Sequence, residues 1–300
     1  MSRREYDKMD KIPFGQANDH IQNACLVIEG GAFRGMYNQG VMDAWMKHGL
    51  NFGCVVGVSA GALAGMNYVS GQIGRSARAN LGCRHDRNYI GTGAFRRAHS
   101  MINLDFLLQD YEDIEPFNTE RFYSDLQRFV AVATNCETGE TEYFEKNACD
   151  DIISAIKASA SMPFISPMVK IGEGLYLDGG CSCKIAYKWA LEQGFEKIVI
   201  IRTRDRKFRK KEKVKQTAKR FYRNYPAFAE KLDASNRDYN AQLDEIDELE
   251  KSGRVFVVAP EDPIHVSRVE GNMEKLGNLY WRGYHDGKEC MMQIKEYLQA

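Results

Sequence analysis

The sequence has no surplus charge of either sign, since its 300 residues include 41 basic and 41 acidic side chains. No global field favours nucleic acid or an anionic surface, so we expect no nucleic-acid partner. The N-terminus contains no apolar run resembling the core of a signal peptide. No later stretch approaches roughly 20 consecutive apolar residues. These absences predict a cytoplasmic protein without a membrane-spanning helix.

Cysteine-based scaffolds and metal centres are also poorly supported. Eight cysteines in a chain of this length are too scattered for a disulfide-dense fold. There is no CxxC pair, and the nearest spacing, Cys181-Ser182-Cys183, is poor evidence for zinc. We therefore expect buried free thiols and no metal site.

Continuous apolar runs predict buried strands at residues 24–29, 52–56, 129–133, 197–201 and 255–259. Strands without polar alternation are covered on both faces, which predicts an α/β fold with a mostly parallel sheet between helical layers. Apolar residues at helical spacing predict a helix over 36–47. No repeat or linker separates two cores, so we expect one domain over residues 23–300. Residues 1–22 are polar and aperiodic, which is typical of a mobile tail or a surface strap.

The one compositional break is a charged segment, which we predict to be helical over about residues 205–252. Twelve Lys and Arg residues fall between positions 202 and 223, and the following residues 233–250 are strongly acidic. One interpretation is a solvated pair of helices whose opposite charges partly neutralise each other. The other is a basic face, residues 202–223, that contacts anionic lipid head groups and makes the protein peripheral to a membrane.

Gly57-Val58-Ser59-Ala60-Gly61 follows an apolar run and precedes the helix-like residues 62–66. In such a G-x-S-x-G turn, small flanking residues permit a strained backbone that exposes the serine hydroxyl at the end of the sheet. The next helix directs its positive dipole toward the serine. The pattern predicts a nucleophile at Ser59, although alone it also fits a simple small-residue turn.

Two further motifs lie at predicted strand ends. The segment Gly30-Gly31-Ala32-Phe33-Arg34-Gly35 lets several backbone N–H groups turn toward one point and form a nest for an anion. The anion would be a tetrahedral oxyanion or a nucleotide phosphate, and a third alternative is a purely structural turn. The glycine spacing matches neither GxGxxG nor a Walker loop, which argues against a nucleotide. In Asp178-Gly179-Gly180, the carboxylate could accept a serine proton, or the pair could be an ordinary Asp-Gly turn.

In this order, the three motifs resemble the patatin-like phospholipase family. Its pattern is G-G-G-x-R-G, then G-x-S-x-G, then D-G-G, on a three-layer α/β/α fold. Residues 133–139 and 158–163 also look like segments of that family, so the resemblance covers about residues 26–201. The third glycine of the loop is Ala32 here. Because alanine disfavours positive φ, we expect the loop to work only if Ala32 has a negative φ.

The resemblance implies a serine acyl hydrolase with a Ser59–Asp178 dyad and no histidine, metal or organic cofactor. Its substrate would be a lipid or other carboxylic ester, such as a phospholipid, a lysophospholipid or an acylglycerol. Backbone N–H groups of Gly31, Ala32 and Ala60 would hold the oxyanion, with Gly30 shaping the turn. Arg34 would fix the loop or meet a substrate phosphate. The remaining glycines of the elbow and the acid motif would shape their turns: Gly57, Gly61, Gly179 and Gly180.

Two rival functions are compatible with the same residues. An α/β-hydrolase with a Ser-Asp/Glu-His triad would use a histidine that follows Ser59, namely His85, His99, His265 or His285. A non-catalytic lipid-binding or regulatory protein would keep the fold without turnover. Acyl transfer to an acceptor other than water also fits the predicted site.

Overall fold

The computed structural model describes residues 4–212 and 217–300. Within these residues, the main sheet has eight strands in the order β10-β9-β2-β3-β5-β8-β7, with β6 paired to β5 outside this path. The strands are β2 (Ile21–Ile28), β3 (Asn51–Val58), β5 (Arg128–Asn135), β6 (Thr141–Glu145), β7 (Val169–Ile171), β8 (Gly174–Asp178), β9 (Ile198–Ile201) and β10 (Phe256–Val258). A separate short pair joins β1 (Gly15–Gln16) to β4 (Gln72–Ile73).

Five adjacent strands of the main sheet are parallel. β10, β9, β2, β3 and β5 form parallel pairs, whereas β6, β7 and β8 are joined by antiparallel pairs. Each predicted apolar run coincides with a strand of the parallel part, and β2 and β3 are buried along most of their length. The prediction of a mostly parallel sheet is therefore confirmed.

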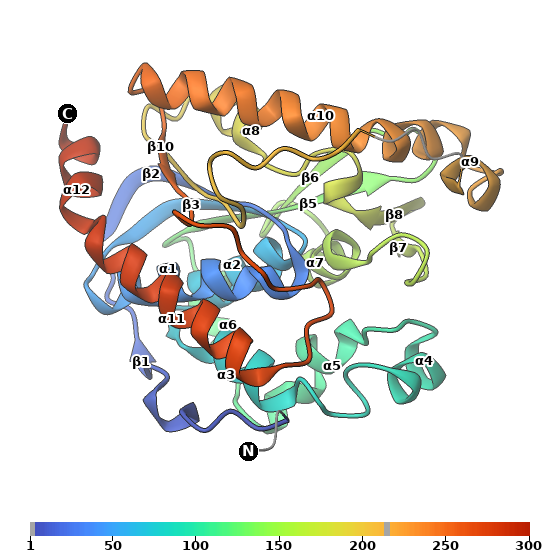
Figure 1. Cartoon of the computed structure of the whole chain (residues 1–300), viewed down its shortest axis with the longest axis horizontal. Coiled ribbons are helices and arrows are strands. Elements are labelled where there is room, and N and C mark those ends of the chain that lie inside the picture. The colour runs from blue at the N-terminus through green and yellow to red at the C-terminus, as the bar shows by residue number, and fades with distance from the viewer. Residues whose placement is uncertain (1–3, 213–216) are drawn as a thin grey trace.

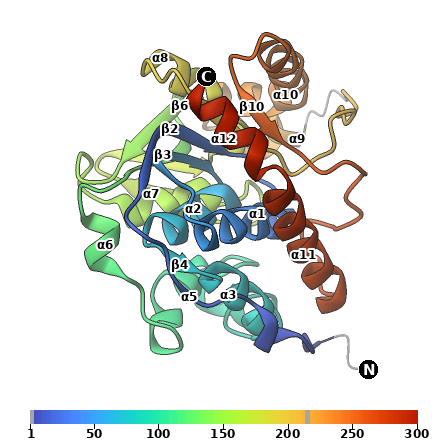
Figure 2. The ribbon, with the colours of Figure 1, turned by 90° about the vertical axis from the view of Figure 1, so that its left-hand side faces the viewer.

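Helices cover both faces of the sheet, as Figures 1 and 2 show. One face packs against α1 (Met36–Lys47), α2 (Ala60–Val69), α7 (Ile152–Ala160) and α11 (Met273–Glu289), and the other against α8 (Tyr187–Glu192) and α10 (Pro226–Lys251). Alternate residues of β2 enter the two cores: Leu26 and Ile28 join the first, Cys25 and Val27 the second. The predicted three-layer α/β/α sandwich is the observed fold.

Shorter helices complete the chain. They are α3 (Arg75–Cys83), α4 (Thr92–Ala98), α5 (Leu104–Leu108), α6 (Thr119–Tyr123), α9 (Thr217–Phe221) and α12 (Met291–Gln299), with the 3-10 turns η1 (Met9–Lys11), η2 (Ala32–Gly35), η3 (Asp110–Asp113) and η4 (Gly179–Cys181). None of the helices in the described part of the chain is long and apolar enough to cross a membrane.

The C-terminal helix α11 packs directly on α1. A Cβ added at Gly40 would lie 2.0 Å from the Tyr280 carbonyl oxygen, and one at Gly283 would lie 2.0 Å from that of Tyr37. The two backbones therefore approach more closely than any larger residue would allow. The Tyr280 hydroxyl also donates to Oδ2 of the buried Asp43 at 2.9 Å. This contact fastens the end of the chain to the helix that follows the glycine-rich loop.

The N-terminal segment matches one of its two sequence alternatives, and the charged segment differs in part from its prediction. The described part of the predicted N-terminal tail is docked like a strap: Tyr6 is buried and its hydroxyl accepts a hydrogen bond from Trp281 Nε1 at 2.8 Å. The predicted charged helical segment at 205–252 is helical over α9 and α10, but residues 205–212 are irregular. Residues 213–216 of that segment lie outside the described residues.

Candidate active site

Ser59 occupies the tight turn between β3 and α2. Its φ of 58° and ψ of −124° lie outside the regions that L-residues usually adopt. A Cβ on either flanking glycine would lie 2.5 Å from a backbone oxygen, that of Gly61 for Gly57 and that of Ile28 for Gly61. The G-x-S-x-G spacing therefore has a steric cause: only glycine fits beside this strained serine.

Asp178 ends β8 and contacts Ser59 directly, although 119 positions separate them in sequence. Ser59 Oγ donates to Asp178 Oδ2 at 2.7 Å, and the Gly180 N–H donates to Asp178 Oδ1 at 2.7 Å. Burial raises the pKa of the Asp178 carboxyl, and these two hydrogen bonds oppose the rise. The acid is thus a desolvated group held against the serine hydroxyl.

The glycine-rich loop runs from the end of β2 through η2 and lies against the serine turn. A Cβ at Gly30 would lie 2.8 Å from the Val58 carbonyl oxygen and 2.9 Å from Ser59 Cβ. Ala32 has a φ of +50°, so the condition of a negative φ, on which the sequence-based prediction made this loop depend, is not met. Alanine retains its backbone N–H in this left-handed conformation, and the tertiary packing of the loop outweighs its local preference.

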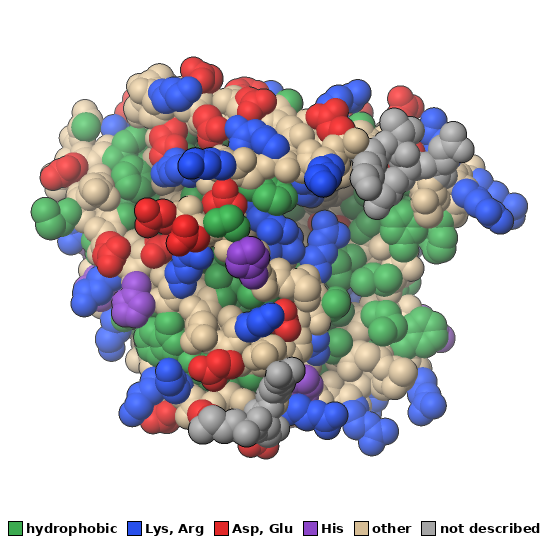
Figure 3. Space-filling view, in the orientation of Figure 1, with side chains coloured by type: hydrophobic (Ala, Val, Ile, Leu, Met, Phe, Trp, Pro, Cys, Tyr) green, Lys and Arg blue, Asp and Glu red, His purple; other side chains and the backbone are tan. Residues whose placement is uncertain are grey.

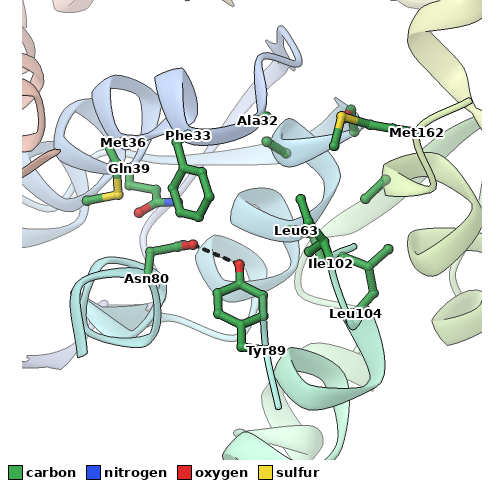
Figure 4. Close-up of a pocket in the computed structure, with 13 residues that line it drawn as sticks. Ala32, Phe33, Met36, Gln39, Leu63, Asn80, Tyr89, Ile102, Leu104 and Met162 are labelled. Carbon is green, nitrogen blue, oxygen red and sulfur yellow. Dashed lines mark hydrogen bonds between the residues drawn. The ribbon is translucent and has the colours of Figure 1, made fainter. Parts of the chain in front are cut away.

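An apolar pocket opens beside Ser59, with an empty space of about 520 Å³ that is partly open to solvent. Figure 4 shows the side chains around it, and Asn80 Oδ1 accepts a hydrogen bond from the Tyr89 hydroxyl at 3.2 Å on its wall. Ala32 and Ala60 line the pocket together with Ser59. Its larger apolar side chains are Phe33, Met36, Leu63, Ile102, Leu104 and Met162. An acyl chain is the kind of ligand that such a wall accepts.

Three residues that support the pair were not assigned roles from the sequence. The Ser159 hydroxyl on α7 accepts a hydrogen bond from the Ser59 N–H at 2.9 Å, and the Ser161 carbonyl accepts one from the Asp178 N–H at 2.9 Å. The Thr134 hydroxyl donates to the Asp178 carbonyl oxygen at 2.9 Å. Residues 133–139 and 158–163 had been singled out only by their resemblance to a family, and these contacts give them a physical function.

The histidines that a triad would need make other contacts. His85 Nε2 lies 2.8 Å from the Gly271 carbonyl oxygen, and the His99 ring lies near that of Phe95. His265 is exposed, and His285 packs near the Trp281 ring. Within the described residues, no histidine ring is hydrogen-bonded to Ser59 or Asp178. The carboxylate meets the hydroxyl without an intervening imidazole.

Arg34 is buried, and its Nε has no hydrogen-bond partner within the described residues. Burial, together with the positive charges of Arg204 and Arg268, lowers the pKa of its guanidinium to about 10. Arg34 therefore keeps an unpartnered donor near the site. Its two predicted roles, fixing the loop and meeting a substrate phosphate, both stay predictions.

Part of the basic run at 202–223 is neutralised by α10. Arg202 Nη1 lies 3.3 Å from Asp247 Oδ1. Arg209 Nη2 lies 2.7 Å from Asp244 Oδ1 and 2.8 Å from Asp247 Oδ2. Arg206 pairs with Glu250. These contacts match the interpretation in which the basic and acidic stretches neutralise each other, although the basic partner is an irregular segment here.

The fold and this pair of residues define an α/β protein with a serine–carboxylate dyad at the carboxyl ends of the sheet strands, beside an apolar pocket. A family model described as patatin-like phospholipase matches residues 26–186. The chain therefore belongs to the patatin-like phospholipases, a family of lipid ester hydrolases. A second model, described as a domain of unknown function (DUF6363), matches residues 225–299. The second region supplies β10, α10 and α11 to the same sandwich.

Two proteins are similar to this chain. The uncharacterised protein YjjU of Escherichia coli (strain K12) is 30% identical over 184 residues, which cover 59% of this chain and 51% of YjjU. The chain thus spans about half the length of that relative. The crystal structure of VipD from Legionella pneumophila superposes with a TM-score of 0.48 at 13% identity, covering 94% of this chain and 68% of VipD.

Proposed function

We propose that this chain is a serine acyl hydrolase that cleaves a carboxylic ester of a lipid, with Ser59 as nucleophile and Asp178 as its base. The observation that carries the proposal is the 2.7 Å contact between Ser59 Oγ and Asp178 Oδ2 beside an apolar pocket. A raised pKa suits Asp178 to this role, because a base works best when its pKa is nearer the operating pH.

The first half of the reaction forms an acyl-enzyme. The Ser59 proton passes to Asp178 while Oγ bonds to the ester carbonyl carbon. The N–H groups of Gly31, Ala32 and Ala60 hold the resulting oxyanion, and one such donor contributes about 3 kcal/mol. When the tetrahedral intermediate collapses, the bond to the alkoxy oxygen breaks and the departing alcohol takes the proton from Asp178.

The second half releases the acyl group. Water attacks the carbonyl carbon of the acyl-serine ester and gives a proton to Asp178. The bond between that carbon and Ser59 Oγ then breaks, the proton returns to Oγ, and a carboxylic acid leaves. An alcohol in place of this water would make the same residues an acyltransferase, so product analysis separates the two outcomes.

The direct test uses short-chain aryl esters, lysophospholipids, phospholipids and acylglycerols with the wild type, Ser59→Ala and Asp178→Asn. We expect Asp178→Asn to lower kcat/KM by about 10²- to 10⁴-fold, the usual contribution of a general base. A fluorophosphonate probe should label the wild type and Ser252→Ala, a matched variant at an exposed serine, but not Ser59→Ala. Equal turnover by all variants would contradict the proposal, and loss of turnover in His265→Ala or His285→Ala would favour a triad.

A further inference from the structure

Five basic side chains lie near one another, and two of them, Lys184 and Arg268, lie near Asp178. They come from η2, from the turn after η4, from the irregular segment after β9, and from the segment between β10 and α11. We name them the cationic cluster: Arg34, Lys184, Arg204, Lys210 and Arg268. Figure 3 shows Lys and Arg side chains gathered in a hollow of this face beneath α10.

The members of the cluster lie close enough to repel one another. Burial and the positive charges of Lys184, Arg268 and Arg34 together lower the pKa of Lys210 to about 6, so its amine is mostly uncharged at neutral pH and gains its full charge when an anion binds beside it. Lys184 and Lys210 approach the same ring, since their Nζ atoms lie 5.9 Å and 4.8 Å from the centre of Tyr239. The pKa of Lys184 is likewise lowered by burial. Arg34 is buried, Lys184, Arg204 and Lys210 are half-buried and Arg268 is exposed, so the cluster lines a place that solvent reaches from one side.

Two carboxylates act on this charge from a distance, since Glu29 favours the charged forms of Arg34 and Lys210 and Asp178 favours that of Lys184. Within residues 4–212 and 217–300, none of the five side chains forms an ion pair with Asp or Glu. The nearby Glu29 is buried, and it accepts hydrogen bonds from the Thr203 N–H and the Tyr239 hydroxyl. Arg34, 7% exposed, keeps a buried Nε without a partner. One unpartnered buried donor, together with neighbouring cations that repel one another and form no ion pair, indicates a site that an anion completes.

The cluster is joined to the catalytic pair by short contacts. Lys184 Nζ donates to the Gly180 carbonyl oxygen at 2.6 Å, two residues after Asp178. Arg34 follows the loop residues Gly31 and Ala32 in η2. The charges of Arg268 and Lys184 also act on the Asp178 carboxyl. An anion bound here would lie next to the ester that Ser59 attacks, on the polar side of the site, while the acyl chain occupies the apolar pocket.

We propose that the cationic cluster binds the negatively charged, phosphate-bearing head group of the lipid substrate, so that the enzyme prefers anionic phospholipids to zwitterionic ones. The inference rests on the proposed function and names the substrate class for it. The apolar wall and the cluster together match a molecule with an acyl chain at one end and a phosphate at the other. A zwitterionic lipid would bring a quaternary ammonium group into the same cations and lose affinity by repulsion.

The test compares phosphatidic acid with phosphatidylcholine carrying the same acyl chains, each diluted in micelles of a neutral detergent. We expect the wild type to favour phosphatidic acid by roughly tenfold or more in kcat/KM, because a charge-assisted hydrogen bond contributes at least that factor. Lys210→Gln and Arg268→Gln should each reduce this ratio about fivefold or more, mainly through KM. The ratio cancels any loss of folding or of general catalysis.

The matched control is Lys207→Gln, an exposed lysine on the same irregular segment that belongs to neither the cluster nor the catalytic pair. This variant should keep the wild-type ratio, which separates a bound head group from a general loss of positive charge. A wild-type ratio near one, or equal ratios in all four proteins, would overturn the proposal.

Two further measurements separate the possible failures. An uncharged aryl ester has no head group, so its Ser59-dependent cleavage tests the proposed function alone. Cleavage of that ester without a preference among phospholipids would overturn the head-group assignment and leave the hydrolase standing. Calorimetry with glycerol 3-phosphate and with inorganic phosphate tests the cluster itself. If the wild type binds both compounds, Arg268→Gln binds neither, and no lipid preference is found, the head-group assignment fails and the cluster is a site for a free anion.

Discussion

Replacing Ala32 by glycine should stabilise the protein, because Ala32 holds a φ of +50°. A non-glycine residue in the left-handed region costs about 1–2 kcal/mol. A new glycine also loosens the unfolded chain, which opposes the gain by roughly 0.4–1 kcal/mol. We therefore expect the free energy of unfolding to rise by about 0.5–1 kcal/mol, or roughly 1–3 °C in Tm for a protein of this size.

Urea denaturation followed by circular dichroism measures this change. The matched control is Ala241→Gly, the same substitution at an exposed position within α10. In a helix interior the exchange should cost about 1 kcal/mol, so the two variants should shift the urea midpoint in opposite directions. A loss of stability in Ala32→Gly comparable to that of the control would show that the backbone at Ala32 is not left-handed, and the steric reasoning would fail.

Three other stability predictions follow from the same structure. Ser59→Gly should be more stable than Ser59→Ala by about 1 kcal/mol, since both lose the hydroxyl but only glycine relieves the φ of 58°; equal urea midpoints would contradict this. Burial raises the pKa of Asp178, so its contribution to stability is present below about pH 4 and is lost as pH rises through the folded-state pKa. Asp178→Asn should therefore be more stable than the wild type at pH 8 and lose that gain near pH 4, and a denaturation series across this range checks the sign. Burial also raises the pKa of Asp43 to about 7, so the wild type should lose stability on the order of 4 kcal/mol between about pH 4 and pH 8. Asp43→Asn should remove most of this slope, and identical slopes in both proteins would refute the assignment.

The sheet and the contact between Ser59 and Asp178 could be predicted because their signals are local. Residues 36–47 were predicted as a helix and form α1 with the same bounds. The strand ends at Ser59 and Asp178 carry glycines that are needed where backbones touch: a Cβ at Gly179 would lie 2.2 Å from the Val132 carbonyl oxygen. Such steric requirements leave a recognisable spacing in the sequence. The two strand ends meet through β5, because Val58 of β3 pairs with Val132 and Asp178 of the antiparallel β8 pairs with the adjacent Ala133.

The support around the pair could not be predicted in the same way. Ser159 lies on α7, and nothing adjacent to it in sequence marks its hydroxyl as the acceptor for the Ser59 N–H. The φ of Ala32 depends on how the loop passes Val58 and Ser59, which is a tertiary contact that local preference opposes. Roles set by a neighbour distant in sequence have no local pattern from which to infer them.

The basic run after β9 is another example of roles that depend on residues distant in sequence. Arg202 and Arg209 meet the acids of α10, whereas Arg204 and Lys210, interleaved with them, belong to the cationic cluster. These four residues contribute equally to the number of positive charges in the run. That number fits a solvated face and a membrane-binding face equally well. Whether a residue pairs with α10 or joins the cluster depends on the side of the irregular segment from which its side chain projects. The acids of α10 therefore neutralise one set of charges, while the other set belongs to the cluster for which we propose an anionic head group as the counter-charge.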